Sequence, residues 1–260
     1  MTKNLRTTCL KKCQSTIGGG LKVFKSITER AVFKDWRASL FLFIVIGCLH
    51  FYAAITKSLP LNFLGMSLYL IVSLTLVRRT NWKDIRIKKP IFPRYIFLGS
   101  ILTILLVLFD YLSRYYTVGF SSSNFFVLMA EQQLSYGAIT ISNRWQYFPI
   151  AALGFSVVSP FTEEFFFRGV LLKAFELKYS ATVANLIQSF LFSFIHLAYF
   201  WLTTFDLRLI IFVPLGMIGG LLFGWLVQKT DSIYTSIILH IVYNLSAIFL
   251  VYAFVIPALK

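Results

Sequence analysis

Two adjacent glutamates and an arginine, Glu163, Glu164 and Arg168, stand inside an otherwise apolar stretch of the chain. Glu164 and Arg168 are four residues apart, so on a helix they share a face and can form an ion pair. Glu163 points about 100° away from Glu164 and has no predicted partner in its own helix. An unpaired carboxylate in a low-dielectric environment suits a general base. We therefore assign Glu163 to chemistry and the Glu164–Arg168 pair to its support.

Two of the three histidines follow the glutamates on later apolar stretches. His240 and Asn244 are four residues apart, so both face one side of a helix and can donate two hydrogen bonds to one point, as a developing oxyanion requires. His196 would then help Glu163 to hold and polarise a water molecule. His50 stands alone in the first apolar stretch, and we assign it to packing or to the membrane interface.

The same residues allow other interpretations. Glu163, His196 and His240 would suffice to hold a zinc ion with an open fourth position for water. The glutamate–arginine group could be a packing staple, although a staple needs one glutamate and not two. A non-catalytic membrane partner, such as a sensor-kinase regulator or a bacteriocin-immunity-type protein, is the main alternative to an enzyme. A proton-coupled transporter ranks last, because no repeated half with broken helices accompanies these residues.

The elements that must position these residues are membrane helices. The chain is 58% hydrophobic and 13% charged, whereas a soluble domain has about 25% charged residues. Seven apolar stretches are long enough to cross a bilayer. We therefore predict an all-α fold, a polytopic transmembrane helical bundle of about seven spans in the cell membrane. The expected helices cover residues 36–56, 59–77, 95–112, 147–175, 180–203, 207–227 and 232–258.

The basic residues predict the orientation of this bundle. The net charge is +15, and nine of the 25 lysines and arginines lie in residues 1–37. Nucleic-acid binding is one interpretation, but a membrane-proximal segment attracted to anionic lipid predicts the same cluster. A cytoplasmic N-terminus places 19 basic residues inside and five outside, in agreement with the positive-inside rule. We expect membrane lipids and no nucleic acid as partners.

The predicted organisation is a basic cytoplasmic segment at 1–35 followed by a transmembrane domain at 36–258. A cleaved signal peptide is not expected, because the first apolar stretch begins only near Trp36. Residues 78–94 should form a basic cytoplasmic loop. Residues 113–146 should form the longest external connection, with room for a short interfacial helix.

Three motifs follow one another on successive apolar stretches: Glu163-Glu164-Phe165-Phe166-Phe167-Arg168, Phe192-Ser193-Phe194-Ile195-His196 and His240-Ile241-Val242-Tyr243-Asn244. Their order and composition resemble the motifs of the CPBP family of intramembrane endopeptidases, also called the Abi or CAAX-processing protease family. The resemblance covers about residues 145–250, and no motif position is altered. It implies a membrane-embedded helical fold and hydrolysis of a peptide bond near the membrane.

By this resemblance Glu163 activates water with His196, while His240 and Asn244 bind the oxyanion. Members of the family were first called metalloproteases and later viewed as glutamate-dependent, so zinc on Glu163, His196 and His240 stays an alternative. The resemblance implies a membrane-associated peptide or protein substrate without fixing which one, and a membrane-protein partner is the non-catalytic alternative. The candidate site residues are Glu163, Glu164, Arg168, His196, His240 and Asn244.

Overall fold

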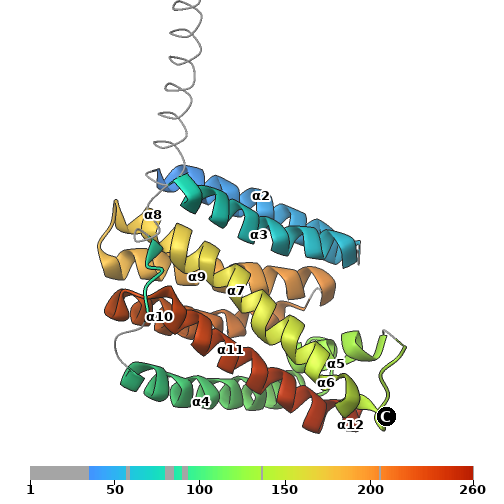
Figure 1. Ribbon diagram of the computed structural model, residues 1–260. Helices are drawn as coiled ribbons and strands as arrows, with labels where there is room; N and C mark the ends of the chain where they lie inside the picture. The colour runs from blue at the N-terminus through green and yellow to red at the C-terminus, as the bar shows by residue number, and fades with distance from the viewer. Residues whose placement is uncertain are drawn as a thin grey trace, which may run out of the picture.

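A computed structural model describes residues 35–56, 59–79, 85–89, 93–135, 137–204 and 206–259 of the chain (Figure 1). Every regular element within these ranges is a helix, so the predicted all-α class is confirmed. The basic segment predicted at 1–35 lies outside the described residues, apart from its last position.

A helix occupies each of the seven predicted ranges. The first three are α2 (Trp36–Ile55), α3 (Leu59–Arg79) and α4 (Pro93–Val118). The fourth is a run of consecutive pieces: α6 (Arg144–Leu153), η2 (Gly154–Val158), α7 (Ser159–Glu164), η3 (Phe165–Leu171) and α8 (Leu172–Glu176). The others are α9 (Ala181–Thr204), η4 (Leu207–Phe212) with α10 (Val213–Thr230), and α11 (Ile233–Leu250) with η5 (Val251–Val255) and α12 (Ile256–Ala258). A short helix, α5 (Phe125–Ser135), lies in the predicted external connection.

Length and composition identify membrane helices among these elements. Within the described residues, five helical segments are long and apolar enough to cross a membrane: Trp36–Ala53, Pro93–Val118, Arg144–Glu176, Leu207–Thr230 and Ile233–Ala258. Ala181–His196 is a shorter apolar helix. Large side chains on α4, among them Phe97, Leu102 and Phe109, are mostly exposed, as a lipid-facing surface requires. The polytopic membrane bundle is therefore confirmed, while the count of seven spans and the orientation stay predictions.

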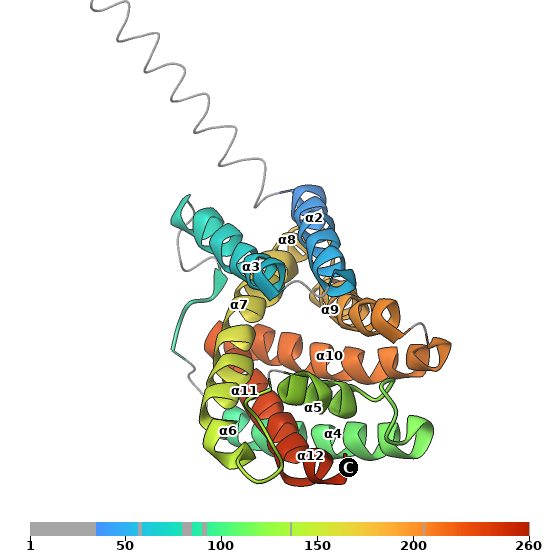
Figure 2. The same cartoon turned by 90° about the vertical axis from the view of Figure 1, so that its right-hand side faces the viewer.

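The helix that carries the glutamates lies between two groups of helices. Helices α2 and α3 lie side by side along one edge of the bundle, and α4 lies at the opposite edge (Figures 1 and 2). The segment α7–η3 packs against α3 on one side and against α11 on the other. Helix α11 in turn packs against α4, and α9 packs most extensively against α10. This arrangement encloses the polar residues of α7 within apolar helices.

Small residues let α9 and α10 approach closely. A Cβ atom at Gly220 would lie 3.1 Å from Cα of Ser189, and a Cβ atom at Gly224 would overlap Oδ1 of Asn185. Across this contact, Nδ2 of Asn185 donates to the carbonyl of Leu221 at 3.0 Å. Small residues and interhelical hydrogen bonds are typical of helix pairs in membranes, where burial of apolar surface provides no driving force.

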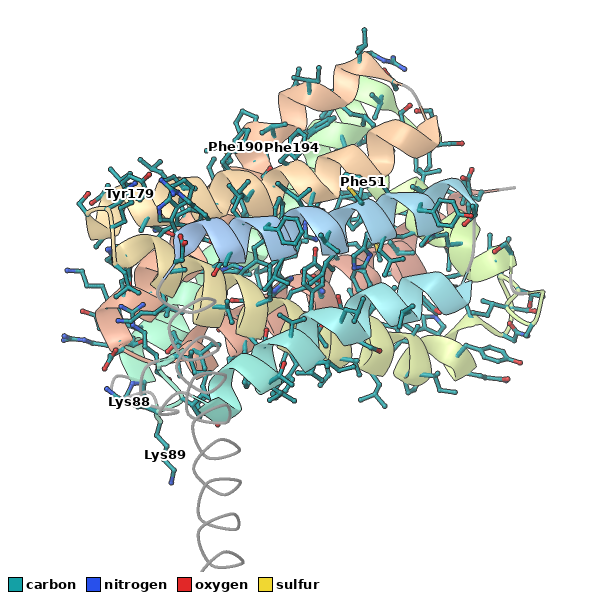
Figure 3. The ribbon with its side chains drawn as sticks, turned by 90° about the horizontal axis from the view of Figure 1, so that it is seen from above. Phe51, Lys88, Lys89, Tyr179, Phe190 and Phe194 are labelled. Carbon is teal, nitrogen blue, oxygen red and sulfur yellow. The ribbon has the colours of Figure 1, made fainter. Side chains whose placement is uncertain are left out.

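The described part of the loop at 78–94 forms hydrogen bonds and ion pairs with the ends of three helices, α8, α10 and α11. The guanidinium of Arg86 bonds Glu176 of α8 at 2.9 Å and Asp231, the residue after α10, at 3.1 Å. The carbonyl of Arg86 accepts from the N–H of Ile233 at the start of α11. Lys88 also pairs with Asp231, and its side chain lies with that of Lys89 at this end of the bundle (Figure 3). These contacts align α8, α10 and α11 on the face predicted to be cytoplasmic.

Gly224→Ala should destabilise the bundle. The added methyl group overlaps Asn185 and must displace the side chain that holds the carbonyl of Leu221, at about 1–3 kcal/mol for an overpacked site. We expect the Tm of the purified protein in detergent to fall by several degrees. Gly219→Ala on the same helix is the control, because its Cβ would meet Leu106 at an ordinary 3.6 Å. Equal Tm values for the two variants would contradict the close α9–α10 contact.

Candidate active site

A proline changes the backbone hydrogen bonding just before the two glutamates. In η2 the N–H of Ser159 bonds to the carbonyl of Gly154, five residues earlier. In the same register the carbonyl of Phe155 would need an N–H from Pro160, and proline has none. Nδ2 of Asn244 on α11 donates to this carbonyl instead, at 2.9 Å. Asn244, predicted to face an oxyanion together with His240, thus commits one amide hydrogen to the backbone of η2.

Glu164 is the centre of a buried ion cluster. Its Oε1 accepts a hydrogen bond from Nη1 of Arg168 at 2.6 Å and one from Nδ1 of His240 at 2.8 Å. The side chains of Glu164 and Arg168 are both fully buried. The guanidinium of Arg168 also lies over the rings of Phe192 and Phe223, 4.3 and 5.5 Å from their centroids. The predicted Glu164–Arg168 pair is therefore present, and it has aromatic partners and a histidine in addition.

Glu163 faces His196 of α9 and His240 of α11. Its Oε2 lies 3.5 Å from Nε2 of His196 and 4.0 Å from Nε2 of His240. Its Oε1 accepts a hydrogen bond from Oγ of Ser159 at 2.5 Å. The prediction that Glu163 has no partner in its own helix is therefore wrong. Ser159 is a site residue that the prediction missed, although its i, i+4 spacing to Glu163 was a signal that could have indicated it.

Hydrogen bonds at Nδ1 fix how the two imidazoles face Glu163. Nδ1 of His196 lies 2.7 Å from the carbonyl of Phe192, which can only accept, so Nδ1 carries a hydrogen. Nδ1 of His240 donates to the Glu164 carboxylate. Each Nε2 is thereby turned toward Oε2 of Glu163, which has no hydrogen-bond partner among the described residues. The His196 side chain is 45% exposed, so the site opens on the side of α9.

Phe192 packs against most of the site. Its ring centroid lies 4.6 Å from that of His196, 5.7 Å from that of His240 and 5.1 Å from that of Phe167. The same ring lies under the guanidinium of Arg168. The sequence marked Phe192 only as a motif position, yet its spacing of four residues from His196 places both on one face of α9. Its packing limits the ways in which the imidazoles and the guanidinium can move.

The described residues include no group of three or more His, Cys, Asp or Glu side chains placed to hold a metal ion. The predicted zinc ligands Glu163, His196 and His240 lie near one another but do not form such a group. No step proposed below uses a metal.

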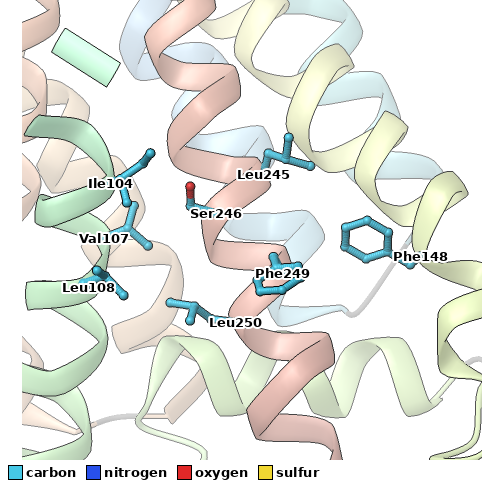
Figure 4. Close-up of a pocket in the computed structure, with 8 residues that line it drawn as sticks. All are labelled: Ile104, Val107, Leu108, Phe148, Leu245, Ser246, Phe249 and Leu250. Carbon is cyan, nitrogen blue, oxygen red and sulfur yellow. The ribbon is translucent and has the colours of Figure 1, made fainter. Parts of the chain in front are cut away.

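A cavity of about 500 Å³ lies elsewhere in the bundle, between α4, α6 and α11 (Figure 4). Ser246 is the one polar residue among the eight that line it. None of the six candidate site residues contributes to this lining. The cavity is an apolar recess, and the groups that can do chemistry lie around Glu163.

Several apolar spans that enclose a carboxylate facing two histidines define a membrane-embedded protein equipped for acid–base chemistry. Residues 143–246 match the family described as type II CAAX prenyl endopeptidase Rce1-like. The match covers about two fifths of the chain and contains all six candidate site residues. It confirms the resemblance to the CPBP family that the three motifs predict. Neither a curated protein nor a solved structure matches the chain.

Arg168→Met should strongly destabilise the protein. It leaves the buried Glu164 without its cation, and removing one partner of a buried pair costs about 3–5 kcal/mol. We expect a large fall in Tm for the purified variant. Adding Glu164→Leu should restore part of the Tm, because the double variant no longer buries an unpaired charge. A double variant less stable than Arg168→Met alone would show that the two residues stabilise the fold independently.

Proposed function

We propose that this chain is an intramembrane endopeptidase of the cell membrane, which hydrolyses a peptide bond of a membrane-associated protein or peptide. The observation that carries the proposal is the position of Glu163 on α7, with Oε2 3.5 Å from His196 on α9 and 4.0 Å from His240 on α11. The match of this segment to an endopeptidase family supports it.

Glu163 is the general base of the proposed reaction. Oε2 of Glu163 and Nε2 of His196 lie 3.5 Å apart, so one water molecule beside them can bond to both. Glu163 takes a proton from this water as the oxygen attacks the carbonyl carbon, and returns a proton to the amine that leaves. Ser159 holds Oε1, which keeps Oε2 turned toward the water.

His240 and Asn244 are the proposed oxyanion ligands. Because Nδ1 of His240 donates to Glu164, its Nε2 can donate to an oxyanion only when the ring carries both protons. In that form Arg168 and His240 carry two positive charges, which balance the two negative charges of Glu163 and Glu164. Asn244 uses one amide hydrogen on the carbonyl of Phe155 and keeps the second for the oxyanion.

Glu163→Gln should abolish proteolysis while leaving the fold intact. We expect membrane peptidomics of host cells at matched expression to find peptides that only the wild type releases, with their formation reduced by about 100-fold or more in the variant. Glu131→Gln, on the exposed face of α5, is the matched control and should release the same peptides as the wild type. Identical profiles for wild type and Glu163→Gln, with the variant still rescuing a deletion phenotype, would favour a non-catalytic membrane partner.

Glutamate-dependent hydrolysis also predicts the metal content. The purified, active protein should contain far less than one zinc ion per chain by mass spectrometry, and a chelator should leave peptide release unchanged. The opposite result, one zinc ion per chain that is lost in His196→Ala, would support the zinc interpretation.

A further inference from the structure

Helices α2 and α3 cover one side of the site, although neither lies within the family match. Seen from above, they run side by side across the bundle (Figure 3). Helix α3 packs against α7 and η3, which carry the glutamate motif, and α2 packs against α3 and α9. The side chains that these two helices present to the motif helix can therefore reach the site.

Tyr69 of α3 lies on the same face of the motif helix as Glu163. Its ring centroid is 4.8 Å from that of Phe166 and 5.9 Å from that of Phe167. These phenylalanines follow Glu163 by three and four residues, the spacing that places side chains on one helix face. Glu163 is also close enough to interact electrostatically with Tyr69. Tyr69 is thus a neighbour of the proposed base.

His50 of α2 accompanies Tyr69. The two rings stack with their centroids 5.2 Å apart and an interplanar angle of 21°. The imidazole rests against Gly65 of α3, where a Cβ atom would lie 3.0 Å from Nε2 of His50. His50 also lies within electrostatic range of Glu163 and His196. His50 therefore packs against α3, as its assignment to packing predicts, and through Tyr69 it lies near the motif helix.

Two polar atoms of this stacked ring pair are buried and have no hydrogen-bond partner among the described residues: Nε2 of His50 and the hydroxyl of Tyr69. Tyr69 is only 3% exposed. Unpaired polar atoms are costly in a protein interior, and a cluster of them points to a ligand that pairs with them. A tyrosine hydroxyl can donate to a carbonyl, and an imidazole nitrogen can bond a carbonyl or an amide N–H. A polypeptide backbone presents both groups.

We propose that His50 and Tyr69 bind the backbone of the substrate peptide next to the scissile bond, along the contact between α2–α3 and α7–η3. This assignment rests on the proposed peptidase function. A peptide that is extended for cleavage within the membrane exposes backbone groups that lipid cannot satisfy, so hydrogen bonds from the enzyme must replace those of the substrate helix. His50 and Tyr69 provide them from α2 and α3, while His196 and His240 belong to α9 and α11.

The test compares variants that remove one polar atom each. Tyr69→Phe removes the hydroxyl and keeps the ring on Phe166 and Phe167. His50→Asn removes the nitrogen at the Nε2 position, whereas His50→Gln keeps an amide there. Tyr252→Phe is the matched control, because this buried tyrosine bonds Gln133 on α5, away from the site.

Initial rates are measured with the full chain in lipid nanodiscs. The substrate is a synthetic peptide that spans a cleavage site used by the wild type and not by Glu163→Gln. We expect Tyr69→Phe and His50→Asn each to raise KM by about 3–10-fold with kcat within twofold of the wild type, since they remove a hydrogen bond made to bound substrate. His50→Gln and Tyr252→Phe should keep the wild-type KM.

Unchanged KM values in Tyr69→Phe and His50→Asn would overturn the assignment, and so would a loss of kcat at unchanged KM. The experiment distinguishes failure of the proposed peptidase function from failure of the proposed binding role of His50 and Tyr69. If no peptide separates the wild type from Glu163→Gln, the peptidase function fails, and the binding role fails with it. If the wild type cleaves the peptide and both variants bind it normally, only the role of His50 and Tyr69 is lost.

Discussion

The buried pair of Glu164 and Arg168 constrains the rest of the bundle. An ionised group inside a membrane costs at least about 2.5–3.5 kcal/mol on insertion scales, so the protein must surround the pair with compensating groups. Helix α11 brings His240 to Glu164, and α9 brings Phe192 to Arg168. Because these helices converge on the pair, the adjacent Glu163 also comes to lie against histidines from both of them.

Apolar length was enough to predict where the helices lie, because a span must satisfy its backbone groups internally whatever it packs against. The fourth range, predicted at 147–175, corresponds to the helical run from Arg144 to Glu176. Its division into α- and π-helical pieces was not predicted. The π-helical piece η2 lies just before Pro160, whose missing N–H is compensated by Asn244, and a contact between distant helices leaves no trace in the local pattern.

Within the site, residue spacing predicted contacts between side chains of one helix, but not contacts between different helices. It predicted the pairing of Glu164 with Arg168, because both ends of that contact lie on consecutive turns. Ser159 and Glu163 have the same spacing of four residues, but their contact was not predicted, because an uncharged serine in an apolar helix is not recognised as a partner for a carboxylate. The position of His50 beside Tyr69 depends on how α2 and α3 dock, which periodicity does not specify. The catalytic roles themselves rest on the proposal and its tests.

The order of the helices along the chain also determines the order in which the contacts of the site can form during synthesis. The contact between Glu164 and Arg168 lies within one helix, so it can form as soon as that helix enters the membrane. Glu163 meets His196 and His240 only after α9 and then α11 have been synthesised, and helices are delivered in chain order. A nascent chain therefore inserts its charged helix as a partly neutralised unit, long before the last histidine arrives. An incomplete chain thus holds the carboxylate of Glu163 without its partners on α9 and α11, and the full polar cluster exists only once the last of these helices is in place.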